Sequence, residues 1–243
     1  MPSAPGLLAL VGGDECKPGN EEQDRMLAER ARGGPAFVVP TAAARQGPEQ
    51  AVAHATRWFG RFGLSLQDLP VLKHSDANSK EVAAAARSGG FFYLVGGDPG
   101  LVVQVLQGSR VWTAIFDAWL DGAALAGSSA GAMALCSHTL IRAGWPDRSN
   151  RRPLDALGVV PGTAVAPHFD TFGHRWVDSA RRELGDVTLL GIDERSAAVW
   201  RDGSWTAAGP GAITVIDGSK TAKFTTGMKI AGLATPARML PTQ

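Results

Sequence analysis

The sequence has 243 residues, and 44% of them are hydrophobic, which is enough for one large domain with a buried core. Its 24 basic and 23 acidic residues leave a net charge of +1 without a basic block, which argues against nucleic-acid binding. No apolar run approaches the roughly 18 residues of a membrane span, and the N-terminus lacks the pattern of a leader peptide. We therefore expect a cytoplasmic protein with a single domain over residues 1–243 and no nucleic-acid or membrane partner.

Strand and helix signals alternate through the first half of the chain. Apolar runs that end in glycine or proline predict buried strands, and the charged or alanine-rich segments between them predict helices. The expected strands are 6–11, 36–40, 69–72 and the start of 90–99, and the expected helices are 20–32, 49–62, 79–86 and one or two within 103–120. This alternation predicts an α/β fold with a doubly wound, mostly parallel sheet and helices on both faces.

Residues 124–133 predict a short apolar strand that runs through a turn of small residues into a helix. Ser129 lies at the turn, with Gly127 two residues before it and Gly131 two residues after it. This Gly-x-Ser-x-Gly pattern is that of a nucleophile elbow, which aims the N–H of the next residue, Ala130, at an oxyanion. A strand–helix turn that is tight for steric reasons alone would carry the same pattern.

The second half of the chain has shorter apolar runs and more turns. The polar segment 145–153 predicts a surface loop, and it is followed by a strand at 163–167, a helix at 175–184 and a strand at 189–194. Beyond these, glycine-containing turns at 202–203, 209–211 and 217–218 predict antiparallel hairpins near the C-terminus.

A serine nucleophile needs a base, and the base needs an acid that orients it. Among five histidines, His168 follows the strand at 163–167, and sites assemble at the carboxyl ends of parallel strands. His174 begins the next helix and is the weaker candidate. The histidines without a motif around them are His54, His74 and His138.

Two carboxylates end the strand at 189–194. Asp193 and Glu194 would point to opposite faces if the strand continued, so only one of them should meet the histidine. Asp147 and Asp170 are competing acids, and both residues of the Asp-Glu pair would also suit a polar turn.

A second N–H for an oxyanion can come from Gly97, because paired glycines at the end of a strand allow a substrate to approach the backbone closely. The segment is not a phosphate-binding loop, since neither Gly-Lys-Ser/Thr nor Gly-x-Gly-x-x-Gly is present there.

Four segments occur in a characteristic order: YLVGGD at 93–98, GSSAGA at 127–132, PHF at 167–169 and GIDE at 191–194. Together they resemble the serine peptidase family that holds aspartyl dipeptidase (peptidase E) and cyanophycinase, family S51, over about residues 6–216. The resemblance implies a flavodoxin-like or class I glutamine amidotransferase-like sheet with a Ser-His-Glu triad at its strand ends.

Position by position, the resemblance implies that Ser129 is the nucleophile, His168 the general base and Glu194 the orienting acid. The N–H groups of Gly97 and Ala130 would hold the oxyanion. The implied reaction is hydrolysis of a small peptide through an acyl-enzyme without a metal or a cofactor, in a protein that could be a homodimer.

Two departures from the family pattern bear on the substrate. Pro99 stands where cyanophycinase-like sequences usually have glutamine, and the arginine-rich stretch after the His-Phe pair is reduced at 170–175. Both departures argue against cleavage of the aspartate–arginine polymer itself. The leading expectation is a peptidase that acts on short peptides, including Asp-containing dipeptides.

Such a substrate needs partners for its charged groups. Arg175 is the expected ligand of a substrate carboxylate, with Arg142 and Arg148 as alternatives. Asp98 and Asp170 could bind a free α-amino group.

Three other functions fit parts of the sequence. An amidotransferase-like hydrolase needs an elbow cysteine, whereas Cys136 lies in the predicted helix beyond Ser129 and suits a small buried position. A binding protein could keep the elbow if His168 or its acid were displaced from the serine. A metal site would use His168, Asp170 and His174, whose spacing matches no common ligand set.

Overall fold

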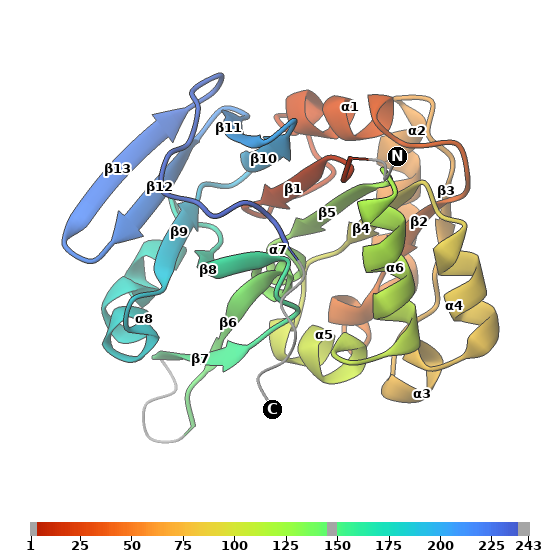
Figure 1. The fold of residues 1–243 in the computed structure, drawn as a ribbon, viewed down its shortest axis with the longest axis horizontal. Coiled ribbons are helices and arrows are strands. Elements are labelled where there is room, and N and C mark those ends of the chain that lie inside the picture. Colours follow the sequence, from red (N-terminus) through yellow and green to blue (C-terminus); the bar gives the residue numbers. More distant parts are fainter. Residues whose placement is uncertain (1–3, 145–149, 238–243) are drawn as a thin grey trace.

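The computed structural model describes residues 4–144 and 150–237, which form two β-sheets and their surrounding helices (Figure 1). The first sheet has seven strands in the order β11-β10-β1-β5-β4-β2-β3. Its parallel part contains β1 (Leu8–Val11), β5 (Ala124–Ser128), β4 (Phe91–Leu94), β2 (Ala36–Val39) and β3 (Leu66–Asp68). The antiparallel hairpin of β10 (Ala197–Arg201) and β11 (Ser204–Ala208) pairs with β1.

The parallel strands are buried on both faces because their side chains alternate between two apolar clusters. Leu8 and Leu10 of β1 belong to the cluster that includes α4, α5 and α6, whereas Ala9 and Val11 belong to the cluster that includes α1 and α2. This arrangement confirms the expected doubly wound fold. The helices around this sheet are α1 (Glu21–Glu29), η1 (Thr41–Ala43), α2 (Pro48–Gly60), α3 (His74–Ala77), α4 (Lys80–Arg87), α5 (Pro99–Leu106) and α6 (Arg110–Leu120).

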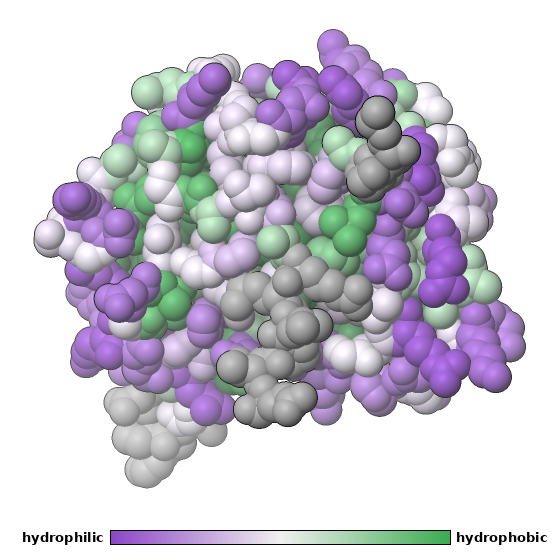
Figure 2. Space-filling view, viewed as in Figure 1, coloured by the Kyte–Doolittle hydropathy of each residue, from purple (hydrophilic) through white to green (hydrophobic). Residues whose placement is uncertain are grey.

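Helix α4 illustrates how these helices are patterned. It buries Ala83 and Ala86 and leaves Lys80, Glu81 and Arg87 exposed. Figure 2 shows hydrophilic residues gathered over α3 and α4 at the right of the view. The alanine stripe that predicts this helix is therefore the face that packs on the sheet.

The second sheet has six strands in the order β13-β12-β9-β8-β6-β7. Strands β6, β8 and β9 are parallel. Strands β7 and β12 are antiparallel to their neighbours β6 and β9, and β13 is antiparallel to β12. The larger apolar cluster contains Leu125 of the first sheet together with Val165 and Leu190 of the second, so the two sheets share a core. The remaining elements are α7 (Ala130–Leu135), β6 (Cys136–Arg142), β7 (Arg151–Asp155), β8 (Val160–Ala166), η2 (Gly173–Trp176), α8 (Val177–Leu184), β9 (Thr188–Ile192), β12 (Ala212–Asp217) and β13 (Lys220–Thr225).

The predicted strand at 69–72 is wrong, because β3 ends at Asp68 before that segment begins. Leu69 and Val71 are buried as expected, but Pro70 lies between them and has no N–H for a strand ladder. The apolar pattern therefore reports the burial of this segment and not its pairing.

The predicted surface loop at 145–153 is also wrong where the structure describes it, since Arg151 to Pro153 lie in β7. Strand β7 is an edge strand, where Pro153 is tolerated because its missing N–H is not required by a second neighbour. Cys136 likewise begins β6 instead of lying in a helix. Residues 145–149 lie outside the described part of the chain.

Two of the three predicted hairpin turns are confirmed. Asp202 and Gly203 join β10 to β11 with φ values of +50° and +81°, as a two-residue hairpin favours. The turn after Asp217 joins β12 to β13. The turn at 209–211 forms no hairpin and instead carries the chain from the first sheet to the second.

No helix within residues 4–144 and 150–237 combines the length and the apolar character that crossing a membrane requires.

Candidate active site

Ser129 lies in the sharp turn between β5 and α7, with a φ of +48° and a ψ of −109°. A Cβ on Gly127 would lie 2.4 Å from the carbonyl carbon of Gly131, and a Cβ on Gly131 would lie 2.3 Å from the carbonyl oxygen of Leu94. Both contacts are with backbone atoms, so the turn has room only for glycine at these positions. The Ser129 N–H donates to the carbonyl oxygen of Val11 at 2.9 Å, which ties the turn to the end of β1.

The imidazole of His168 links Ser129 to Glu194. Its Nε2 lies 3.1 Å from Ser129 Oγ, and its Nδ1 lies 2.7 Å from Glu194 Oε1. His168 follows β8 and Glu194 follows β9, so two adjacent parallel strands bring the pair together. With a proton on Nδ1 donating to Glu194, Nε2 is left to accept the Ser129 hydroxyl proton. The arrangement can therefore activate a serine oxygen as a nucleophile.

Several contacts fix the orientation of the His168 ring. The His168 N–H donates to the Gly12 carbonyl oxygen at 2.7 Å, and the residue has a φ of +50°. The exposed ring of Phe172 stacks on the imidazole with the centroids 4.8 Å apart. A Cβ on Gly13 would lie 2.3 Å from His168 Cε1, so glycine there leaves space for the ring.

The four candidate acids have different surroundings. The Asp193 carboxylate accepts the Ala212 N–H at 2.9 Å, and desolvation by burial raises the pKa of Asp193. Asp170 Oδ1 accepts the Glu194 N–H at 2.9 Å and so supports the segment that carries Glu194. Asp147 lies outside the described residues. Glu194 is thus the acid that the structure brings to the histidine.

The two predicted oxyanion donors lie at the ends of neighbouring strands. Gly97 follows β4 with a φ of +142°, and a Cβ there would lie 2.2 Å from the Ala42 carbonyl oxygen. Ala130 is the first residue of α7. Neither N–H donates to another group in the described part of the chain, so both are available to a substrate oxygen.

The predicted substrate-binding residues occupy the surrounding surface. Asp98 caps α5, where its Oδ1 accepts the Leu101 N–H at 3.1 Å. Arg175 lies in η2 with an exposed side chain, and Arg142 is exposed at the end of β6. Arg148 lies outside the described residues.

Sequence reasoning missed Glu15, which follows the Gly12-Gly13 turn at the end of β1. Its Oε1 accepts the Gly96 N–H at 2.9 Å, and its Oε2 accepts the buried Ser128 hydroxyl at 3.0 Å. It lies two residues beyond the Gly12-Gly13 pair at the carboxyl end of a parallel strand, but nothing in that segment indicates its contacts with Gly96 and Ser128.

Within the described residues, no other histidine or cysteine forms a hydrogen bond with Ser129, His168 or Glu194. Burial raises the pKa of the Cys136 thiol, which keeps that sulfur protonated in the core. His174 Nδ1 lies 2.9 Å from the Phe169 carbonyl oxygen. Within the described residues, no three His, Cys, Asp or Glu side chains form a group that could hold a metal ion.

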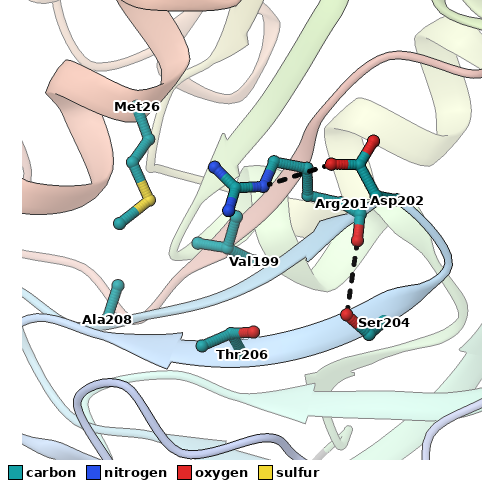
Figure 3. A pocket seen from close by; sticks show the side chains of 7 residues that line it. All are labelled: Met26, Val199, Arg201, Asp202, Ser204, Thr206 and Ala208. Atoms are coloured by element: carbon teal, nitrogen blue, oxygen red, sulfur yellow. Dashed lines mark hydrogen bonds and ion pairs between the residues drawn. The ribbon is translucent and has the colours of Figure 1, made fainter.

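Two surface cavities contrast in their position. One of about 230 Å³ reaches Gly96, beside the elbow, and is lined by Asp14, Glu15, Cys16, Lys17, Ala51, His54, Ala55, Val95 and Gly96. The other, of about 140 Å³, lies between α1 and the β10–β11 hairpin and is drawn in Figure 3. Its charged residues are Arg201 and Asp202, which pair at 3.6 Å on the hairpin turn, and it contains no residue of the Ser129 group.

Comparisons with known proteins agree on fold and family. The model of a family described as peptidase family S51 matches residues 7–207. The crystal structure of a peptidase from an acI-B1 Actinobacterium is 30% identical, with a TM-score of 0.82 over 95% of this chain and 98% of that chain. A cyanophycinase from Trichormus variabilis (strain ATCC 29413 / PCC 7937) is 28% identical over 217 residues, or 86% of this chain and 73% of the relative. The structure of a putative peptidase E protein from Listeria monocytogenes EGD-e shares the fold at 16% identity, with a TM-score of 0.59 over 92% of this chain and all of that chain.

Proposed function

Because the chain belongs to peptidase family S51 and is a peptidase, we propose that it hydrolyses short peptides with Ser129 as the nucleophile. The observation that carries the proposal is the pair of distances from Ser129 Oγ to His168 Nε2, 3.1 Å, and from His168 Nδ1 to Glu194 Oε1, 2.7 Å. Both distances are those of hydrogen bonds. Activation of a serine requires a base within hydrogen-bond distance of the hydroxyl and an acid that orients that base.

In the first half of the reaction, Ser129 Oγ attacks the carbonyl carbon while His168 Nε2 takes the hydroxyl proton. Negative charge develops on the carbonyl oxygen, where the N–H groups of Gly97 and Ala130 would donate to it. His168 then gives its proton to the leaving amine, and the C–N bond breaks to leave an ester on Ser129.

In the second half, water replaces the amine. His168 accepts a proton from the water while the water oxygen attacks the ester carbon. The bond from that carbon to Ser129 Oγ then breaks, His168 returns the proton to Ser129 Oγ, and the acid product leaves. Glu194 keeps the imidazole in one tautomer and stabilises the positive ring that forms in each half.

The proposed substrate is a short peptide, including Asp-containing dipeptides. Pro99 opens α5 where cyanophycinase-like sequences usually have glutamine, which argues against the aspartate–arginine polymer as substrate. Arg175, exposed beside Phe172, is the proposed ligand of a substrate carboxylate. Asp98 and Asp170 each use one carboxylate oxygen for a backbone N–H and keep the other for a polar substrate group.

The alternatives lose their support. An amidotransferase-like reaction would need Cys136 at the elbow, but this residue begins β6 in the core. A binding protein without turnover would have His168 displaced from Ser129 or Glu194 displaced from His168, whereas His168 lies within hydrogen-bond distance of both.

The proposal is tested with a peptide library that contains N-terminal Asp dipeptides and β-linked Asp-Arg, analysed by mass spectrometry. The wild type should cleave members of the library, and Ser129→Ala should lose at least about 10⁴-fold in rate because the nucleophile is absent. An unchanged melting temperature of the variant controls for folding. Hydrolysis by Ser129→Ala at the wild-type rate would exclude the serine mechanism.

A further inference from the structure

The loop after β1 connects the two segments that carry the proposed oxyanion donors. Glu15 Oε1 accepts the Gly96 N–H from the loop after β4 at 2.9 Å, and Glu15 Oε2 accepts the hydroxyl of the buried Ser128 in the elbow at 3.0 Å. Gly96 directly precedes Gly97, and Ser128 lies two residues before Ala130. One carboxylate therefore joins the segments whose N–H groups would hold the oxyanion.

In the loop after β4, hydrogen bonds hold the backbone on both sides of Gly97. Glu15 accepts the N–H of Gly96, and the Asp98 N–H donates to the Ala42 carbonyl oxygen at 2.9 Å. Between them, the Gly97 N–H donates to no group within residues 4–144 and 150–237. A Cβ built on Gly96 would lie 2.9 Å from Glu15 Oε1, so glycine at this position lets the carboxylate approach the backbone. Without Glu15, the loop that presents the Gly97 N–H would lose its support on one side.

The elbow is held in a similar way. The Ser128 hydroxyl donates to Glu15, and the Ser129 N–H donates to the Val11 carbonyl oxygen. The next N–H along the chain, that of Ala130, has no acceptor among the described residues. Hydrogen bonds to a carboxylate are short and strong, so a carboxylate shared by both segments fixes the separation of the two free N–H groups.

Glu15 and its neighbour Asp14 have different partners. Lys17 lines the same cavity of about 230 Å³ and interacts electrostatically with Glu15, so a cation accompanies this carboxylate. Lys17 forms its ion pair with Asp14, which also lies 3.6 Å from Arg195 Nε. Of the two adjacent carboxylates, Glu15 is thus the one that makes hydrogen bonds to the elbow and to the loop after β4.

We propose that Glu15 is a positioning residue that sets the separation of the Gly97 and Ala130 N–H groups and so aligns both with the oxyanion of the tetrahedral intermediate. This inference rests on the proposed function, which supplies the nucleophile and the two donors. Alignment matters because such donors stabilise the oxyanion when they lie about 2.7–3.1 Å from the place where its charge develops. Glu15 acts through the backbone of the two segments and does not touch the reacting atoms.

Glu15→Ala removes both hydrogen bonds. It should lower kcat for a cleaved peptide by about 10²-fold, the cost of a small displacement in an active site, and leave KM within a few-fold. A boronic acid analogue of that peptide, with boron in place of the attacked carbonyl carbon, binds Ser129 as a tetrahedral anion. Its affinity should fall by the same factor as kcat/KM. If folded Glu15→Ala had a lower melting temperature but unchanged kcat and boronic acid affinity, Glu15 would only stabilise the fold and the inference would be overturned.

Glu15→Gln tests the hydrogen bonds without the charge. Its amide oxygen can accept the Gly96 N–H, and its NH₂ group can donate to Ser128 Oγ, because a hydroxyl oxygen also accepts. This variant should therefore recover most of the activity that Glu15→Ala loses. A loss in Glu15→Gln as large as that in Glu15→Ala would assign the effect to the charge or to a transferred proton, and would contradict a positioning role.

Ser128→Ala removes only the hydrogen bond on the elbow side. It should lower kcat and the boronic acid affinity by about 10-fold, and it should add nothing to the loss in Glu15→Ala, where that bond is already absent. Additive losses in the double variant would show that the two residues act separately, against the inference. If Glu15→Ala does not fold, unchanged kcat and boronic acid affinity in Ser128→Ala would overturn it.

Asp14→Asn is the matched control, because its carboxylate faces Lys17 and Arg195 instead of the elbow. It should keep kcat and the boronic acid affinity within a few-fold of the wild-type values. A loss equal to that of Glu15→Ala would assign the effect to the whole loop after β1 and would reject a specific role for Glu15.

The wild type distinguishes failure of this inference from failure of the proposed function. If Ser129→Ala abolishes both cleavage and boronic acid binding while Glu15→Ala and Ser128→Ala behave as the wild type, the positioning role alone is rejected. If Ser129→Ala abolishes neither, the proposed function is rejected, and with it the premise of the inference.

Discussion

Ser129 and His168 both have backbone conformations that residues with side chains rarely adopt, with φ values of +48° and +50°. Such conformations cost about 1–3 kcal/mol each and persist only where surrounding contacts hold them. The holding contacts are adjacent here, since Ser129 donates its N–H to Val11 and His168 donates its N–H to Gly12. The end of β1 thus sets the separation of the serine and the histidine.

Glu194 and Asp193 provide a residue-scale test because they are neighbours with different partners. Glu194→Gln should lower kcat by about 10³–10⁴-fold, since an amide can impose the wrong tautomer on the His168 ring and does not stabilise its positive form. Asp193→Asn should keep kcat within a few-fold, because its carboxylate accepts a backbone N–H of Ala212 and not the imidazole. Steady-state kinetics on one cleaved peptide measures both effects.

The reverse order of these two effects would assign the orienting role to Asp193. Equal, small effects would mean that His168 acts without a carboxylate from this strand end. Unfolding curves of both variants serve as the control for global destabilisation.

The sequence predicts Ser129 and His168 from their segments and Glu194 from the family resemblance, and the structure places His168 within hydrogen-bond distance of the other two. Glu15 and Phe172 could not be found in this way. The contact of Glu15 is with Gly96, 81 positions away in the chain, and nothing in either segment alone specifies that pairing. Nothing in the sequence distinguishes Phe172 from other aromatic residues. Its stacking on the His168 imidazole depends on the conformation of the segment after β8.

At the scale of elements, continuous apolar runs predict the parallel strands because those strands are buried on both faces. The same reasoning misses β6 and β7, since residues such as His138, Arg142 and Arg152 lie within them and break any apolar run. These strands gain their stability from pairing with neighbours, which composition does not reveal.

The contact between α1 and α2 predicts a pH dependence of stability. Asp24 is buried and accepts a hydrogen bond from Trp58 Nε1 at 2.7 Å. Desolvation raises the pKa of Asp24 from 3.8 to about 8, and the charges of Glu15 and Glu21 act in the same direction. The folded state therefore holds a proton that the unfolded state releases between about pH 4 and pH 8. The free energy of unfolding should fall through this window by about 1.4 kcal/mol per pH unit from this group.

Asp24→Asn keeps an acceptor for Trp58 and removes the titration. Urea unfolding at pH 5, 6.5 and 8 should show the variant gaining stability relative to the wild type at each step upward in pH. The exposed Asp217→Asn serves as the matched control, and its difference from the wild type should stay constant. If the free energy of unfolding changed with pH in the same way for Asp24→Asn and the wild type, Asp24 would not be a buried carboxyl group that is protonated in the folded state.

At the scale of the whole molecule, the candidate site lies where the strand ends of two sheets meet. Glu15, Gly97 and Ser129 follow β1, β4 and β5 of the first sheet, whereas His168 and Glu194 follow β8 and β9 of the second. The alternation of strands and helices predicts the doubly wound first sheet. The division of the strands into two sheets could not be predicted, because strand partners are chosen by contacts between distant segments.

The central claim, that Ser129 is an activated nucleophile, is tested most directly by mass spectrometry after reaction with a fluorophosphonate. An activated serine oxygen displaces fluoride from phosphorus and gains one phosphonyl group. The account predicts one adduct per chain on the peptide that contains Ser129, and no such adduct in Ser129→Ala or His168→Gln. An unlabelled Ser129 in protein that still cleaves peptides, or a label on another residue that accompanies loss of activity, would contradict it.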